Sequence, residues 1–351
     1  MKIGVFVPNW IGDAVMCTPT LRALRRNFGP SAKLVGILRP YVADCLAGSA
    51  WLDDMIFFDR RSDDPAMWSG AVRRRMREQK LDATIHLTNS FRTALLAWLS
   101  GVKERVGYVR NGRGPLLTHK LYNPRRGFRR LPTSTIDEYL ALAYAMGCEL
   151  ESPRLELATL PADEAAADAI WNKHNLPSGD QVVVLNSGGA YGAAKIWPSE
   201  YFARLARRIV DEQGLSVLVL CGPAERMMAR EIVKLADHPR VTGLADEDLS
   251  VGLSKACVRR SRLLVTTDSG PRFFAVAFDV PVVSLFGPTP IAATRTHYDR
   301  EICLHHAVPC GPCGKRTCPL KHHDCMRLLH VERVYATVVE QLNRQRTIRA
   351  A

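Results

Sequence analysis

The stretch KIGVFVPNWIGDAVM, residues 2–16, passes from an apolar run through a short loop into the start of a helical pattern. An uninterrupted apolar run of this length is typical of a strand that is buried on both faces. Runs of the same kind recur in the first half of the chain, at 32–38, 55–59, 83–87 and 105–109. Helical patterns separate them. Continuous apolar strands that alternate with helices indicate a parallel sheet covered on both faces.

The same alternation begins again after residue 160. Apolar runs stand at 181–187, 216–222, 262–267 and 281–287, with helical patterns between them. A chain of 351 residues is also too long for one ordinary core. We therefore predict two doubly wound α/β domains, over residues 1–160 and 161–330, followed by a helix within residues 331–351.

The charge of the chain is unevenly distributed. The formal charge is +13, and +9 of it lies in residues 1–160. The densest part is a segment at 110–136 that we interpret as a long loop without acidic residues; its basic residues are Arg110, Arg113, Lys120, Arg125, Arg126, Arg129 and Arg130. A basic half indicates an anionic partner, such as nucleic acid, a phosphorylated lipid or a phosphorylated sugar. Solubility is the plainer explanation of the same charge.

The apolar segments and the cysteines also indicate the cellular compartment in which the protein is expected. No run of 18 or more apolar residues occurs, so we predict no membrane-spanning helix. Pro8 and Asp13 interrupt the apolar start, which is therefore interpreted as a strand and a turn rather than a signal peptide. Five of the ten cysteines are scattered in apolar segments, as expected for reduced, buried thiols of a cytoplasmic protein: Cys17, Cys45, Cys148, Cys221 and Cys257.

The loops after the strands are the candidate binding sites, because ligands of parallel sheets bind at the carboxyl ends of the strands. The first loop holds Asn9, Trp10 and Asp13, and Asp13 stands at a helix start, where a role as N-cap alone is the alternative. The loop after residues 181–187 is rich in small residues, which let a phosphate approach backbone N–H groups, and it contains Lys195. A solvated surface lysine is the alternative there.

Two further loops of the second half complete the pattern. Ser269 and Gly270 follow a strand and open a helix, whose N–H groups and dipole favour an anion. Asp268 before them would repel a phosphate unless it orients N–H groups or caps the helix. Glu225 also follows a strand, where a carboxylate can accept hydrogen bonds from ribose hydroxyls. Neither GxGxxG nor GxxxxGK[ST] occurs, which argues against a dinucleotide-binding protein and a P-loop ATPase.

Taken together, these loops resemble those of glycosyltransferase family 9, the bacterial ADP-heptose:lipopolysaccharide heptosyltransferases. The resemblance rests on five segments in the family's order and spacing: MKIGVFVPNWIGDAVMCTPTLRALR, SGGAYGAAKIWP, CGPAE, TTDSGP and PVVSLFGPTP. Within the family, Asn9-Trp10 before Ile11-Gly12-Asp13 and the C-terminal cysteine–histidine segment are most similar to the heptosyltransferase II group. The resemblance covers nearly the whole chain.

The resemblance implies a GT-B fold, in which two Rossmann-like domains face one cleft and the last helix returns to the N-terminal domain. The N-terminal domain would receive the lipopolysaccharide core precursor, and the C-terminal domain would bind ADP-heptose. Asp13 would be the general base for an acceptor hydroxyl in one inverting displacement, and Lys195 would stabilise the departing ADP. The donor-binding residues would be Ser187, Gly188, Glu225, Asp268, Ser269 and Gly270. The acceptor-binding residues would be Asn9, Trp10, Arg110, Arg113 and Lys120.

The resemblance further implies an enzyme that needs no cofactor for catalysis and works in the cytoplasm, peripherally at the inner membrane. One position departs from the family, which usually has a histidine three residues after the glycine of the Asp-Ser-Gly turn. This chain has Phe273 there. The change removes an ionisable group near the phosphates, and either Arg272 offsets it, or the donor is altered, or the activity is weakened.

A cysteine cluster near the C-terminus stands apart from these loops. Its spacing is Cys310-x2-Cys313-x4-Cys318-x6-Cys325, with His322 and His323 inside it. Four thiolates this close could hold a structural zinc ion or an iron–sulfur cluster. Disulfides are uncommon inside cells, and free thiols in a loop are the remaining alternative.

Three other functions stay open at this point. A family 9 enzyme could use another nucleotide sugar or acceptor, and a relative altered at Phe273 could bind without catalysis. The basic segment and the cysteine cluster could also mark a nucleic-acid-binding protein with a metal module. Against that, only Tyr122 and Phe128 supply aromatic rings within residues 110–136, so nucleic acid is not an expected partner.

Overall fold

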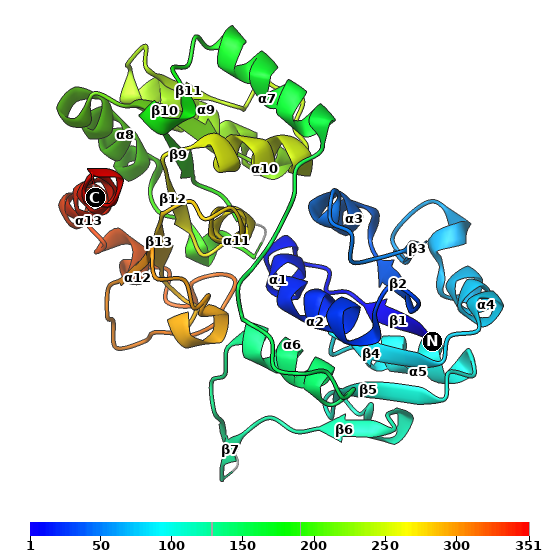
Figure 1. The fold of residues 1–351 in the computed structure, drawn as a ribbon. Helices are drawn as coiled ribbons and strands as arrows, with labels where there is room; N and C mark the ends of the chain where they lie inside the picture. The colour runs from blue at the N-terminus through cyan, green and yellow to red at the C-terminus, as the bar shows by residue number, and fades with distance from the viewer. Residues whose placement is uncertain (128, 190, 351) are drawn as a thin grey trace. The chain divides into compact units, whose positions relative to one another are not determined.

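The computed structural model describes residues 1–127, 129–189 and 191–350 of the chain. Phe128 of the basic segment therefore lies outside the described residues, as do the side chains of Arg126, Arg129 and Arg130. The chain divides into two compact units (Figure 1). Unit 1 comprises Met1–Ala158 and Ala292–Thr296, and unit 2 comprises Thr159–Ile291 and His297–Ala351.

Unit 1 is built on a sheet of six parallel strands in the order β3-β2-β1-β4-β5-β6. The strands are β1 (Lys2–Phe6), β2 (Lys33–Leu38), β3 (Asp54–Phe57), β4 (Ala83–His86), β5 (Glu104–Tyr108) and β6 (His119–Leu121). The helices are α1 (Ile11–Met16), α2 (Thr18–Phe28), α3 (Pro40–Leu46), α4 (Ser69–Gln79), α5 (Phe91–Leu99) and α6 (Thr135–Tyr144). Apolar side chains of β1, β2, α4 and α5 share one of its buried clusters.

Unit 2 repeats the same plan, with its six parallel strands in the order β11-β10-β9-β12-β13-β14. The strands are β9 (Val182–Asn186), β10 (Ser216–Leu220), β11 (Val241–Gly243), β12 (Leu263–Thr267), β13 (Val282–Phe286) and β14 (Glu301–His305). The helices are α7 (Pro161–Lys173), α8 (Ser199–Gln213), α9 (Arg226–Ala236), α10 (Val251–Arg260), α11 (Gly270–Ala277), α12 (Asp324–Arg327) and α13 (Val331–Ala350).

Both sheets therefore have the strand order of a Rossmann fold. The order reverses between β1 and β4 in unit 1, and between β9 and β12 in unit 2. At such a switch point the two following loops leave the sheet in opposite directions and open a crevice. The predicted fold class, two doubly wound α/β units, is confirmed. β9, β12 and β13 are buried along their whole length, as their uninterrupted apolar runs predict.

The sequence patterns missed five of the described strands. β6 lies inside the segment interpreted as a long loop, and that segment also contains the short antiparallel pair β7 (Arg125–Arg126) and β8 (Arg129–Arg130). β6 is the outermost strand of its sheet, and His119 and Lys120 are exposed, so it has no apolar run to reveal it. β11 and β14 also lie at sheet edges, where the demand for apolar residues is weaker.

The last helix packs within unit 2. α13 contacts α8, β13 and β14 of that unit, and its expected return to the N-terminal domain stays a prediction. Val334, Val338 and Leu342 are buried at helical spacing on the side that faces them. An apolar stripe of this kind shows that a helix has a packing face, without showing which surface covers it. Among the described residues, no helix is long and apolar enough to cross a membrane.

Candidate functional site

The switch point of unit 2 brings two of the predicted loops together. Asn186 ends β9, and its side-chain amide donates to the Gly188 carbonyl at 3.1 Å and to Ser269 Oγ at 2.8 Å. The same amide donates to Thr266 Oγ1, near the end of β12, at 3.0 Å. One amide therefore fastens the loop after β9 to the loop after β12, as the strand-end argument predicts.

Ser187 and Gly188 offer polar groups at this junction. Ser187 is completely buried, and its hydroxyl has no hydrogen-bond partner among the described residues. Such a group costs free energy unless a ligand or a water satisfies it. Ser269 is the N-cap residue of α11, but its side chain makes no capping hydrogen bond. The Ser269 hydroxyl thus lies at a helix N-terminus, where an anion is favoured.

Glu225 lies against two glycines. A Cβ atom on Gly188 would lie 2.4 Å from Glu225 Cγ, and one on Gly222 would lie 2.5 Å from Glu225 Oε2. Only glycine allows this close approach at both positions. Within the described part of the chain, no hydrogen bond engages the Glu225 carboxylate. The carboxylate is therefore placed beside the Ser187–Gly188 turn with its acceptors available.

Lys195 is buried rather than solvated. It ends a short 3-10 helix (Ala193–Lys195) and is only 8% exposed. Its ammonium group donates to Asp268 Oδ2 at 2.7 Å and to the Asp268 carbonyl at 2.8 Å. It also lies 4.4 Å from the centre of the Tyr191 ring. The alternative of a solvated surface lysine is therefore wrong.

Asp268 is the acceptor on which these cations converge. Besides Lys195, it accepts from Arg272 Nη1 at 3.1 Å and from Thr289 Oγ1 at 2.8 Å. Burial alone raises the pKa of the Asp268 carboxyl, but Lys195 and Arg272 outweigh it, and the pKa is lowered overall. The carboxylate is thus ionised at neutral pH and orients a lysine beside the candidate phosphate site. Thr289 and Glu301 were missed by the sequence analysis, although Thr289 lies in the quoted PVVSLFGPTP segment.

Arg272 does not replace the absent histidine as a free cation. It is completely buried, and its guanidinium makes a two-point ion pair with Glu301 at 2.6 and 3.1 Å. Burial lowers the pKa of Arg272, but Glu301 raises it more, so the group stays charged. Its guanidinium lies 4.9 Å from the ring of Phe273, which is itself buried. Arg272 is therefore paired with Glu301, and its charge also stabilises the Asp268 carboxylate.

The switch point of unit 1 presents Asn9, Trp10 and Asp13. Asn9 and Trp10 are exposed, and the Asn9 carbonyl accepts a hydrogen bond from the Tyr41 hydroxyl. Trp10 is the N-cap residue of α1, so Asp13 is the third residue of the helix and not its N-cap. Asp13 is partly buried in the first turn. A carboxylate in the first turn of a helix interacts favourably with the helix dipole, and Asp13 therefore lies at the switch point of unit 1 in a position that favours its negative charge.

The predicted acceptor-binding basic residues differ in exposure. Lys120 is exposed on β6, and Arg110 pairs with Glu138 at 3.1 Å. Arg113 is completely buried and donates to the Tyr108 carbonyl at 2.8 Å and to Asn89 Oδ1 at 3.0 Å. Burial and the neighbouring Arg110 lower the pKa of Arg113 to about 10. The structure thus places Arg113 inside unit 1, where it ties the end of β5 to the loop after β4.

The cysteine cluster begins after β14 and ends inside α12, which contains Cys325. Its four cysteines are free and line one cavity of about 30 Å³ together with His322 and His323. Among the described residues, no three His, Cys, Asp or Glu side chains are arranged as a ready-made metal site. The other predicted thiols, at Cys17, Cys45, Cys148, Cys221 and Cys257, are free and buried as expected.

Comparison with known proteins identifies the family. The model of a family described as glycosyltransferase family 9 (heptosyltransferase) matches residues 69–323. The chain belongs to glycosyltransferase family 9. The resemblance drawn from the five sequence segments is confirmed, and the protein is a glycosyltransferase of the heptosyltransferase type.

Several relatives match most of this family 9 chain. Lipooligosaccharide heptosyltransferase 2 of Campylobacter jejuni is 25% identical over 338 residues, which are 95% of this chain and 97% of the relative. Lipopolysaccharide heptosyltransferase 2 of Escherichia coli is 27% identical over 331 residues, which are 89% and 91% of the two chains. The structure of E. coli ADP-heptose lps heptosyltransferase II has a TM-score of 0.79 and 21% identity, and covers 99% of this chain and 100% of that one.

The buried ion pair of this site yields a stability prediction. Asp268→Asn leaves Lys195 and Arg272 without their shared carboxylate, and breaking a buried pair costs about 3–5 kcal/mol of the free energy of unfolding. Because the folded-state pKa of Asp268 is lowered, its stabilising effect is present at neutral pH and is lost as the pH falls below about 4. The urea midpoint should therefore change less between pH 7 and pH 3 in the variant than in the parent protein.

Asp246→Asn is the matched control, because Asp246 pairs with Arg230 on the exposed surface of the same unit. It should leave the urea midpoint at pH 7 nearly unchanged. Equal losses in the two variants would contradict the assigned role of Asp268.

Proposed function

We propose that this family 9 enzyme transfers heptose from ADP-heptose to the inner core of lipopolysaccharide. The family match over residues 69–323 carries the proposal. It is supported by the relatives from C. jejuni and E. coli, which are named lipooligosaccharide and lipopolysaccharide heptosyltransferases. A further fold relative, with a TM-score of 0.71 and 15% identity, is the E. coli heptosyltransferase WaaC with ADP.

In this proposal the switch point of unit 2 binds the donor. The Ser187 hydroxyl, the Gly188 N–H and the α11 N-terminus at Ser269 and Gly270 donate to the diphosphate. Lys195 supplies the positive charge, and Asp268 holds it in place. The Glu225 carboxylate, pressed against Gly188 and Gly222, accepts from the ribose hydroxyls. The site thus offers donors to the phosphates and an acceptor to the sugar.

The proposed reaction is a single displacement with inversion. Asp13 takes the proton from an acceptor hydroxyl as its oxygen bonds to the anomeric carbon and the bond from that carbon to the phosphate oxygen breaks. Lys195 stabilises the negative charge that develops on ADP. Asn9, Trp10, Arg110 and Lys120 are the proposed acceptor contacts of unit 1. No cofactor takes part in this step, and a metal at the cysteines would have a structural role.

Phe273 favours one alternative within the family. A buried phenyl ring stands where relatives have an ionisable histidine, so a donor other than ADP-heptose is the second candidate. Release of ADP from ADP-heptose, only when a suitable lipopolysaccharide core acceptor is present, tests the main proposal. Turnover of another nucleotide sugar, without turnover of ADP-heptose, would establish the alternative.

The base assignment predicts the behaviour of Asp13→Asn. The amide cannot accept the proton, so kcat should fall by about 10²–10⁴-fold, while the affinity for ADP stays close to that of the parent. Initial rates of ADP release and calorimetric titration with ADP measure the two quantities. Asp63→Asn, in an exposed loop of the same unit, is the control and should keep full activity. Full activity of Asp13→Asn would refute the assignment.

The ribose contact predicts the behaviour of Glu225→Gln. Hydrogen bonds to a charged group contribute about 1.5–3 kcal/mol, so the Kd for ADP should rise about tenfold or more. Glu231→Gln, on the exposed face of α9, removes the same charge without touching the site and should not change the Kd. Unaltered ADP affinity in Glu225→Gln would place the ribose elsewhere.

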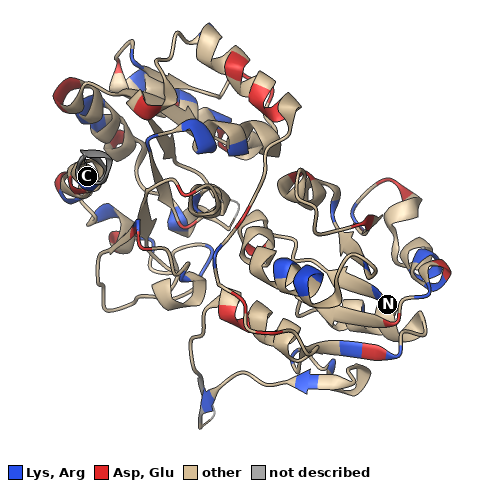
Figure 2. Cartoon of the chain, in the orientation of Figure 1, with Lys and Arg blue, Asp and Glu red and all other residues tan. Residues whose placement is uncertain are grey.

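We also propose that unit 1 associates peripherally with the anionic inner membrane, since the acceptor is a lipid. α4 exposes Arg73, Arg74, Arg75 and Arg77, and the basic residues of this helix are visible in Figure 2. Trp98, at the end of α5, is 52% exposed. The adjacent Ser100 donates to the Arg73 carbonyl, which brings this end of α5 beside α4. Exposed arginines next to an exposed tryptophan are typical of a membrane-surface contact.

Vesicle binding tests this surface. Each basic residue near an anionic membrane contributes about 1 kcal/mol, so Arg73→Glu with Arg77→Glu should lower partitioning to phosphatidylglycerol vesicles by roughly thirtyfold or more. Co-sedimentation measures it. Lys234→Glu, on the exposed face of α9, is the charge control and should bind like the parent. Equal binding to phosphatidylcholine vesicles would contradict the proposal.

A further inference from the structure

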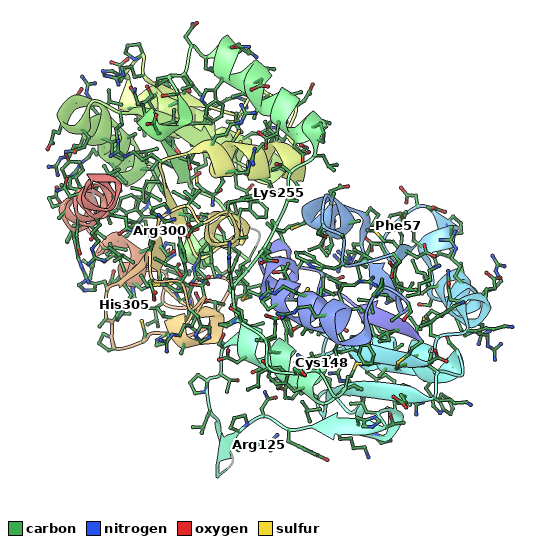
Figure 3. All side chains as sticks on the ribbon, in the orientation of Figure 1. Phe57, Arg125, Cys148, Lys255, Arg300 and His305 are labelled. Carbon is green, nitrogen blue, oxygen red and sulfur yellow. The ribbon has the colours of Figure 1, made fainter. Side chains whose placement is uncertain are left out.

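The segment between β14 and α12 makes hydrogen bonds with the loop that contains Lys195. This segment comprises residues 306–323 and is called the cysteine loop here. It begins directly after His305, the last residue of β14, which is labelled in Figure 3. The Arg316 carbonyl accepts from the Ala194 N–H at 3.0 Å. The Gly314 carbonyl accepts from the Tyr191 hydroxyl at 2.6 Å. Backbone groups of the cysteine loop therefore bind the residues on either side of Gly192.

Two further contacts join the same two loops, and the four contacts together are called the clamp here. His323 Nε2 lies 2.8 Å from the Ala194 carbonyl, which can only accept, so the ring donates. Gly192 has a φ of +147°, and a Cβ atom there would lie 2.5 Å from the Arg316 carbonyl oxygen. The approach of the two loops thus requires glycine. Because Ala194 immediately precedes Lys195, any shift of the cysteine loop moves the base of the lysine side chain.

The cysteine loop has little else to hold its own shape. Between His305 and Asp324 the structure contains no helix or strand among the described residues. All four cysteines nevertheless line one cavity of about 30 Å³, whose lining also includes His322 and Ala194. His322 Nε2 lies 3.8 Å from Cys310 Sγ. A cavity of this volume is large enough for one water-sized occupant.

Four soft sulfur ligands around one small cavity match the preference of zinc-class divalent cations for tetrahedral thiolate sites. The side chains of the described residues are not arranged as a ready-made site, so binding would require the thiols of Cys310, Cys313 and Cys318, which lie outside helices and strands, to turn toward Cys325 in α12.

We propose that Cys310, Cys313, Cys318 and Cys325 bind one thiophilic divalent cation, and that this ion stabilises the cysteine loop in the form that positions Lys195. The ion is structural, because it takes no part in the transfer step. Binding releases protons from the thiols and forms four metal–sulfur bonds without any change of oxidation state. The site lies wholly within unit 2.

Cobalt(II) is the probe for the metal site. Reduced, metal-free full-length protein should take up one cobalt ion per chain and develop the thiolate-to-cobalt charge-transfer band of a tetrahedral site, which added Zn²⁺ then abolishes. Cys313→Ser with Cys318→Ser should abolish the band, whereas Cys148→Ser, outside the cluster, should keep it. No band in the parent at excess cobalt, or an unchanged band in the double variant, would overturn the proposal.

ADP binding tests the coupling to Lys195. Removal of zinc by a chelator should raise the Kd for ADP about fivefold or more, and zinc should restore it. Tyr191→Phe removes one bond of the clamp but no thiol, so it should weaken ADP binding while keeping the cobalt band. Equal Kd values with and without zinc would refute the coupling. Neither measurement uses heptosyl transfer, so failure of this proposal is distinguishable from failure of the proposed function.

Discussion

The buried ion pair between Lys195 and Asp268 constrains the rest of unit 2. A lysine that is almost fully buried must have a charged partner, because an unpaired ammonium group in a protein interior costs several kcal/mol. Asp268 supplies the partner, and Arg272 and Glu301 lie behind it as a second buried pair. The turn after β12, the start of α11 and the edge strand β14 are therefore held in one electrostatic network. The lysine beside the proposed diphosphate site is oriented before any donor arrives.

Much of this architecture could be predicted from the sequence. Uninterrupted apolar strands revealed both doubly wound units, and the strand-end rule predicted that the loops after β9 and β12 meet, as the bond from Asn186 to Ser269 shows. The bond between Lys195 and Asp268 could not be predicted in the same way. The two residues are 73 positions apart, and their contact depends on the course of an irregular loop that the cysteine loop supports. Local patterns carry no information on such a contact.

Two other features escaped for equally physical reasons. Arg113 belongs to the basic segment, and charged residues are nearly always exposed, so nothing in its surroundings marked it as an internal brace. The edge strands β6 and β14 need fewer apolar residues than central strands, so their sequences resemble loops. In each case the pattern described the residue or element, and the tertiary surroundings decided its role.

The burial of three basic residues changes what the net charge of +13 means for an approaching anion. Arg113, Lys255 and Arg272 have no exposed surface, and each is hydrogen-bonded or ion-paired to oxygen atoms inside the protein. The field that reaches into solvent comes instead from exposed residues such as the arginines of α4. That field is screened over about 8 Å at physiological ionic strength, whereas the buried Lys195 acts only at contact. Added salt should therefore lower the rate of association with anionic surfaces much more than it lowers the affinity for a bound nucleotide.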